Sequence, residues 1–321
     1  MAACAGATSS IVGEDAVVMM LTDMYEDSLL YLAAGMIANC LESAGHFSQA
    51  CKQLLQLLQP LLSASRKSSF ESLCVQAGLS VIPVHVQLNP SEVHRCNTVL
   101  RFGITVVELD ISGCHLGLEG SKTIAWTLLA SSSSLTKLNV ADNQLGLHGG
   151  EAVGDALRFN TSLASLNVSS NRLGAMGVKA IGEALSLNTS LTSLDLSFNF
   201  IDDAGVQVLA KSLVINSSLE ELKLHSNGIG PEGCNAVAEA LMVNKSLTCL
   251  DCAHNYFGAE GGMILGKVLR RNRSLKQISL WGNALGQEGG KAIGEAMHAN
   301  LSIESLDTRR NEIVGEATEQ L

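Results

Sequence analysis

Hydrophobic residues follow two alternating spacings along this chain. In Leu191–Ser218 the first residues read L-x-x-L-x-L-x-x-N-x-I, so leucines recur at the short spacing of a strand. The residues that follow place Val206, Leu209 and Leu213 three or four apart, which is the spacing of one helix face. The pattern predicts one short strand and one helix in this unit.

The same unit recurs at a fixed interval. Successive copies begin at Leu135, Leu163, Leu191, Leu219, Leu247, Leu275 and Ile303. An earlier copy begins at Val106 and is one residue longer. A constant period of about 28 residues indicates a solenoid, in which each unit packs against its neighbours. Because helices are wider than strands, we expect an α/β horseshoe with parallel strands on the concave face and helices on the convex face.

Three regions follow from this pattern. Residues 1–12 are small and polar, and we expect them to be disordered. Residues 13–103 read as a helical N-terminal cap, in which Ser80–Leu88 is strand-like and Pro90–Phe102 helical, as in a degenerate repeat. A solenoid needs such a cap to cover its end layer, and a docking role for the same region is the alternative. Residues 104–321 form the array, with about eight units of about 28–29 residues.

Composition narrows the classes of partner and compartment. The net charge of −10 leaves no basic footprint for nucleic acid. The longest uncharged stretch, Leu73–Ser91, contains two prolines and polar residues, so we expect no membrane insertion. The N-terminus does not resemble a secretory signal, and the nine scattered cysteines suit a reducing compartment. We expect an intracellular, cytoplasmic protein, with nuclear and axonemal locations as alternatives.

One asparagine recurs after every predicted strand from the second copy onwards. At this bend, backbone N–H and C=O groups are buried without a strand partner, and an amide side chain can both donate to and accept from them. We therefore predict a buried structural ladder with no binding role. Its members are Asn143, Asn171, Asn199, Asn227, Asn255, Asn283 and Asn311.

A second asparagine recurs just after every predicted helix. Asn tolerates the left-handed conformation that closes a helix, so we expect this series to form C-terminal caps. The members are Asn160, Asn188, Asn216, Asn244, Asn272 and Asn300.

The repeat unit with L-x-x-L-x-L-x-x-N-x-[LI]-G and a full helix resembles the ribonuclease-inhibitor class of leucine-rich repeats. The match covers residues 106–321. That class includes the inhibitor itself, the C-terminal arrays of NOD-like receptors and the Ran GTPase-activating proteins. The shared residues are the structural ones, so the resemblance specifies the fold more closely than the function. It implies a cytoplasmic protein-binding horseshoe.

Large and charged side chains gather on the predicted strands of the later repeats. In the strand motif the Leu side chains point inward, and those beside them face the concave side. These exposed positions hold Phe198, Lys223, His225, Asp251, His254, Trp281, Asp307, Arg309 and Arg310. Because Trp and Arg are enriched at binding hot spots, we predict a protein-docking patch here, with Trp281 foremost. The alternative is that they are ordinary surface residues.

Two residue sets imitate reactive sites, but their expected geometry excludes the chemistry. Cys249 and Cys252 lie three apart on a strand and face opposite sides, so they cannot share a zinc ion. Ser226, His254 and Asp251 resemble a catalytic triad, but an open sheet offers neither an oxyanion hole nor an enclosed pocket. We therefore predict no catalytic residue, no metal, no cofactor and no small-molecule substrate.

Two functions remain after these exclusions. The favoured one is a non-enzymatic scaffold that binds a partner protein on the concave face. The alternative is a GTPase-activating protein resembling the Ran activators. Against it, no acidic tail follows the repeats, and no catalytic residue of that family can be matched to a position in this sequence.

Overall fold

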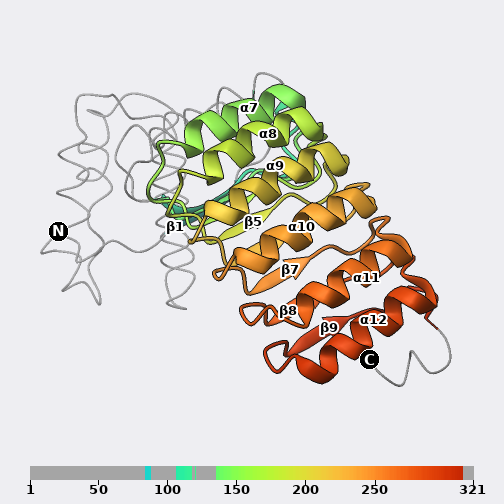
Figure 1. Ribbon diagram of the computed structural model, residues 1–321. Coiled ribbons are helices and arrows are strands. Elements are labelled where there is room, and N and C mark those ends of the chain that lie inside the picture. The colour runs from blue at the N-terminus through green and yellow to red at the C-terminus, as the bar shows by residue number, and fades with distance from the viewer. Residues whose placement is uncertain (1–83, 88–105, 118–119, 121–134, 314–321) are drawn as a thin grey trace, which may run out of the picture. The chain divides into compact units, whose positions relative to one another are not determined.

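The computed structural model describes residues 84–87, 106–117, 120 and 135–313 (Figure 1). The chain divides into two compact units, residues 1–86 with 94–108, and residues 87–93 with 109–321. The disordered segment predicted at 1–12 and nearly all of the cap predicted at 13–103 lie outside the described residues. Strand β1 (Val84–Gln87) forms within the strand-like stretch Ser80–Leu88, and β2 (Val106–Asp110) begins the first repeat.

Strands and helices alternate through the second unit. The strands are β3 (Lys137–Asn139), β4 (Ser165–Asn167), β5 (Ser193–Asp195), β6 (Glu221–Lys223), β7 (Cys249–Asp251), β8 (Gln277–Ser279) and β9 (Ser305–Asp307). The helices are α7 (Gly146–Leu157), α8 (Gly174–Leu185), α9 (Asp202–Ile215), α10 (Pro231–Val243), α11 (Gly258–Leu269) and α12 (Gly286–Ala299). Each helix follows its strand, as the two spacings predict, and the α/β repeat solenoid is confirmed.

Strands β3 to β9 pair in parallel and in sequence order. Leu138 is aligned with Leu166, and Leu166 with Leu194, so identical repeat positions stand side by side. Helices α7 to α12 stack beside one another and the strands lie along the opposite side of the array (Figure 1). We call these two sides the helix face and the strand face.

The core lies between the two faces. Leu191, Leu194 and Leu196 of one repeat are fully buried, as are Val206 and Leu209 of the helix that follows. Equivalent residues are buried in the neighbouring repeats, so the core is a continuous series of thin aliphatic layers. The side chains between these leucines on each strand point away from the core and form the strand face.

The ladder asparagines are buried and bond to the repeats before them. Asn199 Oδ1 accepts hydrogen bonds from the backbone N–H groups of Asn171 (3.0 Å) and Leu173 (3.2 Å). Its Nδ2 donates to the carbonyl oxygens of Val168 and Leu196, both at 3.0 Å. The same bond from backbone N–H to Oδ1 joins Asn143 to Asn171, Asn199 to Asn227, Asn227 to Asn255, and Asn283 to Asn311.

One link of this ladder is missing, between Asn255 and Asn283. Asn283 Oδ1 is fully buried and has no donor among the described residues. The bend that faces it holds Phe257, buried where the other repeats have Leu or Ile. Beside it, the N–H of Tyr256 donates to the carbonyl of Ile229 at 2.7 Å. We attribute the changed bend to the phenyl ring of Phe257, which takes more room than an aliphatic side chain.

The second asparagine series is buried, but its expected left-handed conformation is wrong. None of these six asparagines has a positive φ, and Asn216 is extended at φ −66° and ψ 132°. Its Oδ1 accepts from the N–H groups of Ser218 (3.0 Å) and Leu219 (2.8 Å). Its Nδ2 donates to the carbonyls of Leu185 (2.8 Å) and Asn188 (3.0 Å) in the previous repeat. Each helix end is therefore tied to its neighbour by a second ladder.

Candidate functional site

Five side chains form a continuous row across five consecutive repeats on the strand face. The rings of Phe198 and His225 are tilted, with centroids 4.8 Å apart. His225 and His254 meet edge to face at 5.3 Å, and His254 and Trp281 do so at 4.0 Å. The guanidinium carbon of Arg310 lies 5.1 Å from the centroid of Trp281. We call these five residues the aromatic row.

The members of the row come alternately from two neighbouring repeat positions. Counting the first Leu of each unit as position 1, His225 and Trp281 occupy position 7, and Phe198, His254 and Arg310 occupy position 8. In the first four of these repeats the other of the two positions holds a small residue, namely Ser197, Ser226, Ala253 and Gly282. This alternation gives each large side chain room to lean against the next.

The row is partly buried and partly open to solvent. Phe198 is 50% exposed, and His254 and Arg310 are also exposed. His225 and Trp281 are half-buried beneath their neighbours. The row is therefore a surface that is already packed on one side and still exposes part of its rings to solvent.

Electrostatics at the centre of the row favour an uncharged imidazole. Burial lowers the pKa of His225, and the neighbouring His254 lowers it further, while the carboxylates of Asp251 and Asp195 act in the opposite direction. The net effect places the pKa below its ordinary value of 6.5.

The predicted acidic residues have local partners. Asp251 Oδ1 accepts from the N–H of Ala253 at 2.9 Å, so part of its hydrogen-bonding capacity holds the end of strand β7. Asp307 accepts two bonds from the Arg309 guanidinium, at 2.9 and 2.7 Å. That pairing lowers the pKa of Asp307. Asp307 and Arg309 therefore form an exposed ion pair beside the row rather than two separate charges.

Lys223 lies at the end of strand β6, on the same side of the strand as His225. Its ammonium lies 3.3 Å from Glu221 Oε1. Burial opposes the charge of Lys223, but the carboxylates of Glu221 and Asp195 outweigh it and raise its pKa. Lys223 therefore stays charged in a predominantly acidic setting.

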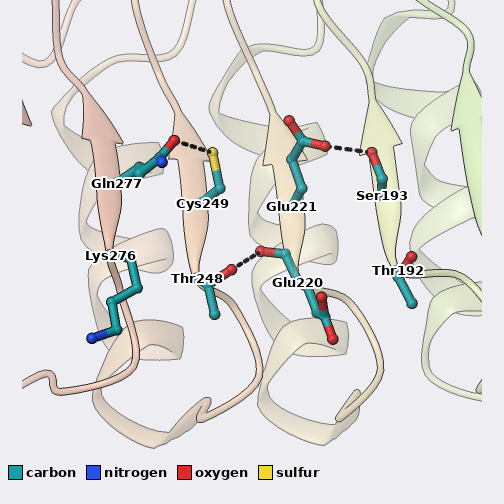
Figure 2. A pocket seen from close by; sticks show the side chains of 8 residues that line it. All are labelled: Thr192, Ser193, Glu220, Glu221, Thr248, Cys249, Lys276 and Gln277. Atoms are coloured by element: carbon teal, nitrogen blue, oxygen red, sulfur yellow. Dashed lines mark hydrogen bonds between the residues drawn. The ribbon is translucent and has the colours of Figure 1, made fainter. Parts of the chain in front are cut away.

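A shallow polar groove of about 340 Å³ lies at the beginning of strands β5 to β8 (Figure 2). Its lining comes from positions 2 and 3 of four repeats: Thr192, Ser193, Glu220, Glu221, Thr248, Cys249, Lys276 and Gln277. The hydroxyl of Ser193 donates to Glu221 at 2.7 Å, and this bond lowers the pKa of Glu221. The large side chains at positions 7 and 8, which mark the row in the sequence, do not indicate this groove. Strand alternation nevertheless places the position-3 residues of the groove on the strand face.

Within the described ranges, no group of three or more His, Cys, Asp or Glu residues is placed to hold a metal ion. Cys249 is half-buried on the strand face and Cys252 is buried beneath it, the opposite orientations that strand alternation predicts. None of the described helices is long and apolar enough to cross a membrane.

Comparisons with known proteins agree with the repeat architecture. A family model described as "Leucine Rich repeat" matches residues 104–125, 131–154, 159–182, 187–210, 216–238 and 271–294. The segment between the last two matches contains Phe257 and the bend that lacks a ladder bond. No curated protein shows significant similarity to the chain.

Three solved structures are similar at low sequence identity. Leiomodin-1 actin-binding site 2 has a TM-score of 0.42 and 24% identity, covering 48% of this chain and 88% of that one. The tropomodulin C-terminal domain from Caenorhabditis elegans has a TM-score of 0.41 and 19% identity, covering 47% and 92%. The leucine-rich repeat-containing protein LegL7 from Legionella pneumophila has a TM-score of 0.47 and 18% identity, covering 72% and 85%.

Proposed function

We propose that this chain, which matches a leucine-rich repeat model over six segments, is a non-enzymatic scaffold of the ribonuclease-inhibitor type that binds a partner protein on its strand face. The aromatic row is the observation that carries the proposal. It joins Phe198, His225, His254, Trp281 and Arg310 in one surface. Aromatic and Arg side chains are the types that contribute most of the binding free energy at protein interfaces.

The backbone supports a binding role for the row. Phe198, His254 and Arg310 have φ values of 57°, 54° and 56°, in the left-handed region where a side chain costs free energy. Asp142, Ser170 and Ser226 occupy the same repeat position with φ values of 54°, 56° and 54°, and Gly113 and Gly282 with 65° and 66°. The bend therefore belongs to every repeat, and in three of them it holds a large, exposed side chain at the end of the strand.

Packing within the row lowers the cost of binding. A partner that buries Trp281 does not have to order it first, because His254 and Arg310 already contact its ring. Asp251, Lys223 and the Asp307–Arg309 pair lie around the row and supply the polar rim of the site. Such rims contribute to specificity and to the rate of encounter more than to affinity.

We also propose an intracellular location. Cys234, Cys249 and Cys252 are free thiols, and burial raises the pKa of Cys234 and Cys252. Buried thiols of this kind are inert packing residues and suit a reducing compartment.

A comparative affinity purification tests the function. Immobilised wild type, Trp281→Ala and Tyr256→Ala are exposed to the same cell extract, and bound proteins are quantified by mass spectrometry. Tyr256 is the control because it is 71% exposed and lies outside the row. We expect a partner that Trp281→Ala loses and Tyr256→Ala retains. With that partner purified, Trp281→Ala should weaken the Kd by about tenfold or more.

Two outcomes contradict the proposal. One is a set of bound proteins that does not change between wild type and Trp281→Ala. The other is strong acceleration of GTP hydrolysis by Ran or another small GTPase, which would assign the chain to the activating proteins instead.

A further inference from the structure

A second exposed surface runs along the array where the helices end. Phe159, Leu187, Ile215 and Val243 occupy the same position in four consecutive repeats, each directly before an asparagine of the second series. Their exposed fractions are 75%, 64%, 68% and 56%. Val214 and Met242, the residues before two of them, are also exposed and widen the strip. We call these side chains the apolar ridge.

The fold does not require apolar residues at these four positions. The asparagine that follows each of them is buried and makes the bonds that join neighbouring repeats, whereas the ridge side chain points away. In the next repeat the same position holds Arg271, which is also exposed. Single exposed apolar residues are common on proteins, but a row from adjacent repeats is a contiguous patch, which marks an interaction site.

The ridge ends in a group of cations. Lys245, Arg270 and Arg271 are exposed, and none of them has an ion-pair partner in the part of the chain that the structure describes. Arg273 differs, because its guanidinium donates to the carbonyls of Arg270 and Asn272. The three other cations are therefore available to an anionic ligand.

We propose that the apolar ridge and its cations bind an amphipathic helix of a partner protein, with acidic residues at the end that meets Lys245, Arg270 and Arg271. An amphipathic helix repeats its apolar side chains at i, i+3, i+4 and i+7, which gives it a narrow stripe to lay along a row of this kind. Carboxylates at one end of that helix fix its direction along the ridge.

Two other occupants fit the surface less well. A second copy of this chain needs about 800 Å² from each partner for a stable interface. The six ridge side chains, one Phe and five smaller apolar residues, are all partly buried already and supply less. An anionic membrane also combines apolar contacts with cations, but a chain of net charge −10 is repelled from it as a whole.

The ridge is separate from the aromatic row. Ridge residues precede each strand in the chain, whereas the row residues follow it, so the two surfaces lie at opposite ends of the strands. Loss of one surface therefore leaves the other intact, and the two proposals fail independently.

Synthetic peptides and vesicles test the proposal on the full chain. The probe is a labelled amphipathic helix of about 20 residues, long enough to be helical when bound, with Leu on one face and Glu elsewhere. Its counterpart carries Lys in place of Glu, and vesicles of phosphatidylcholine with phosphatidylserine form the third arm. Fluorescence anisotropy and co-sedimentation measure binding. We expect the acidic peptide to bind, and the basic peptide and the vesicles not to bind.

Variants locate the binding. Leu187→Asp and the double change Arg270→Glu with Arg271→Glu should each raise the Kd for the acidic peptide by about tenfold or more. Met176→Asp is the matched control, because Met176 is 61% exposed in the same repeat but lies at the other end of helix α8. Met176→Asp and Trp281→Ala should both keep the Kd within about twofold of the wild-type value. Thermal melts of every variant should confirm that it is folded. Equal binding of both peptides, no effect of Leu187→Asp, or binding to vesicles alone overturns the proposal.

Discussion

His254 meets Trp281 edge to face, with ring centroids 4.0 Å apart and ring planes at 86°. The residue after Trp281 is glycine, and a Cβ atom at Gly282 would lie 3.4 Å from His254 Nδ1. Such a Cβ would make an ordinary van der Waals contact with the imidazole, so the His254 ring lies directly beside the backbone of Gly282. Edge-to-face aromatic pairs contribute about 0.5–1.5 kcal/mol beyond the area that they bury. Together with the stacked pair of His225 and Trp281, whose ring centroids are 6.4 Å apart, this contact joins the indole to both histidines of the row.

A double-mutant cycle should detect this contact in the free protein. We expect His254→Asn and Trp281→Ala to couple by about 0.5–1.5 kcal/mol in the free energy of unfolding, measured with urea. Asn is the replacement because it tolerates the left-handed backbone at this position. Phe198→Asn is the control, because Phe198 packs on His225, and its coupling to Trp281→Ala should be near zero. Equal coupling in both cycles would contradict the edge-to-face contact.

Acidification should destabilise the array through His225. Its pKa is lowered in the folded chain, so the unfolded chain takes up a proton first as the pH falls through about 6.5. The stability that the neutral imidazole contributes is complete above that pH and decreases towards the folded pKa. Urea unfolding between pH 7.5 and 5 should show this loss, and His225→Asn should reduce it. The ionisable side chains that act on the pKa of His225 are Asp251, His254 and Asp195.

Replacing either of two equivalent ladder asparagines by alanine should lower the free energy of unfolding by different amounts. Asn199→Ala leaves the N–H groups of Asn171 and Leu173 buried without an acceptor, which costs about 1–3 kcal/mol. Asn283→Ala removes an oxygen that has no donor among the described residues, so its cost should be smaller. Both variants lose the Nδ2 donor, so their difference reports the acceptor alone. Identical melting curves for the two would show that Asn283 Oδ1 is bonded in solution.

Glycines at one helix position should also respond differently to alanine. A Cβ at Gly154 would lie 2.5 Å from the carbonyl carbon of Ala180, which is a clash with backbone. A Cβ at Gly182 would have one close neighbour, a carbon of the Val208 side chain at 3.1 Å. Because backbone cannot move aside as a side chain can, Gly154→Ala should cost about 1–3 kcal/mol. Gly182→Ala should be nearly neutral, since Ala210 occupies the equivalent position in the next helix. Thermal unfolding compares the two.

The constant repeat period was enough to predict the fold, because one register applies to every pair of strands from β3 to β9. Periodicity could not predict what depends on side-chain size at a single place. Phe257 occupies an aliphatic position, and the bend of its repeat differs in a way that we attribute to the size of its ring. Asn216 illustrates a second limit, since the sequence placed it after a helix but suggested the wrong backbone conformation.

The sequence predicted which residues belong to the candidate site better than it predicted how they pack against one another. Strand alternation and residue type selected Trp281 and its neighbours, but both position 7 and position 8 were candidates in every repeat. Which side chain joins the row depends on the small residue beside it. The polar groove was missed because its lining residues are individually ordinary, and only their alignment across four strands makes a concave surface.

Because the aromatic row alternates between positions 7 and 8, its arrangement depends on the number of repeats that lie between its members. Removing residues 247–274 takes out one whole repeat, and the ladder asparagines on either side of the cut, Asn227 and Asn283, still stand one repeat period apart in the shortened chain. The same cut brings His225 and Trp281, both at position 7, onto neighbouring strands. Two large rings then occupy one column, and the column beside it holds only Ser226 and Gly282. Removal of a single repeat thus preserves the backbone period, but the alternation of the row is preserved only when an even number of repeats is lost or gained.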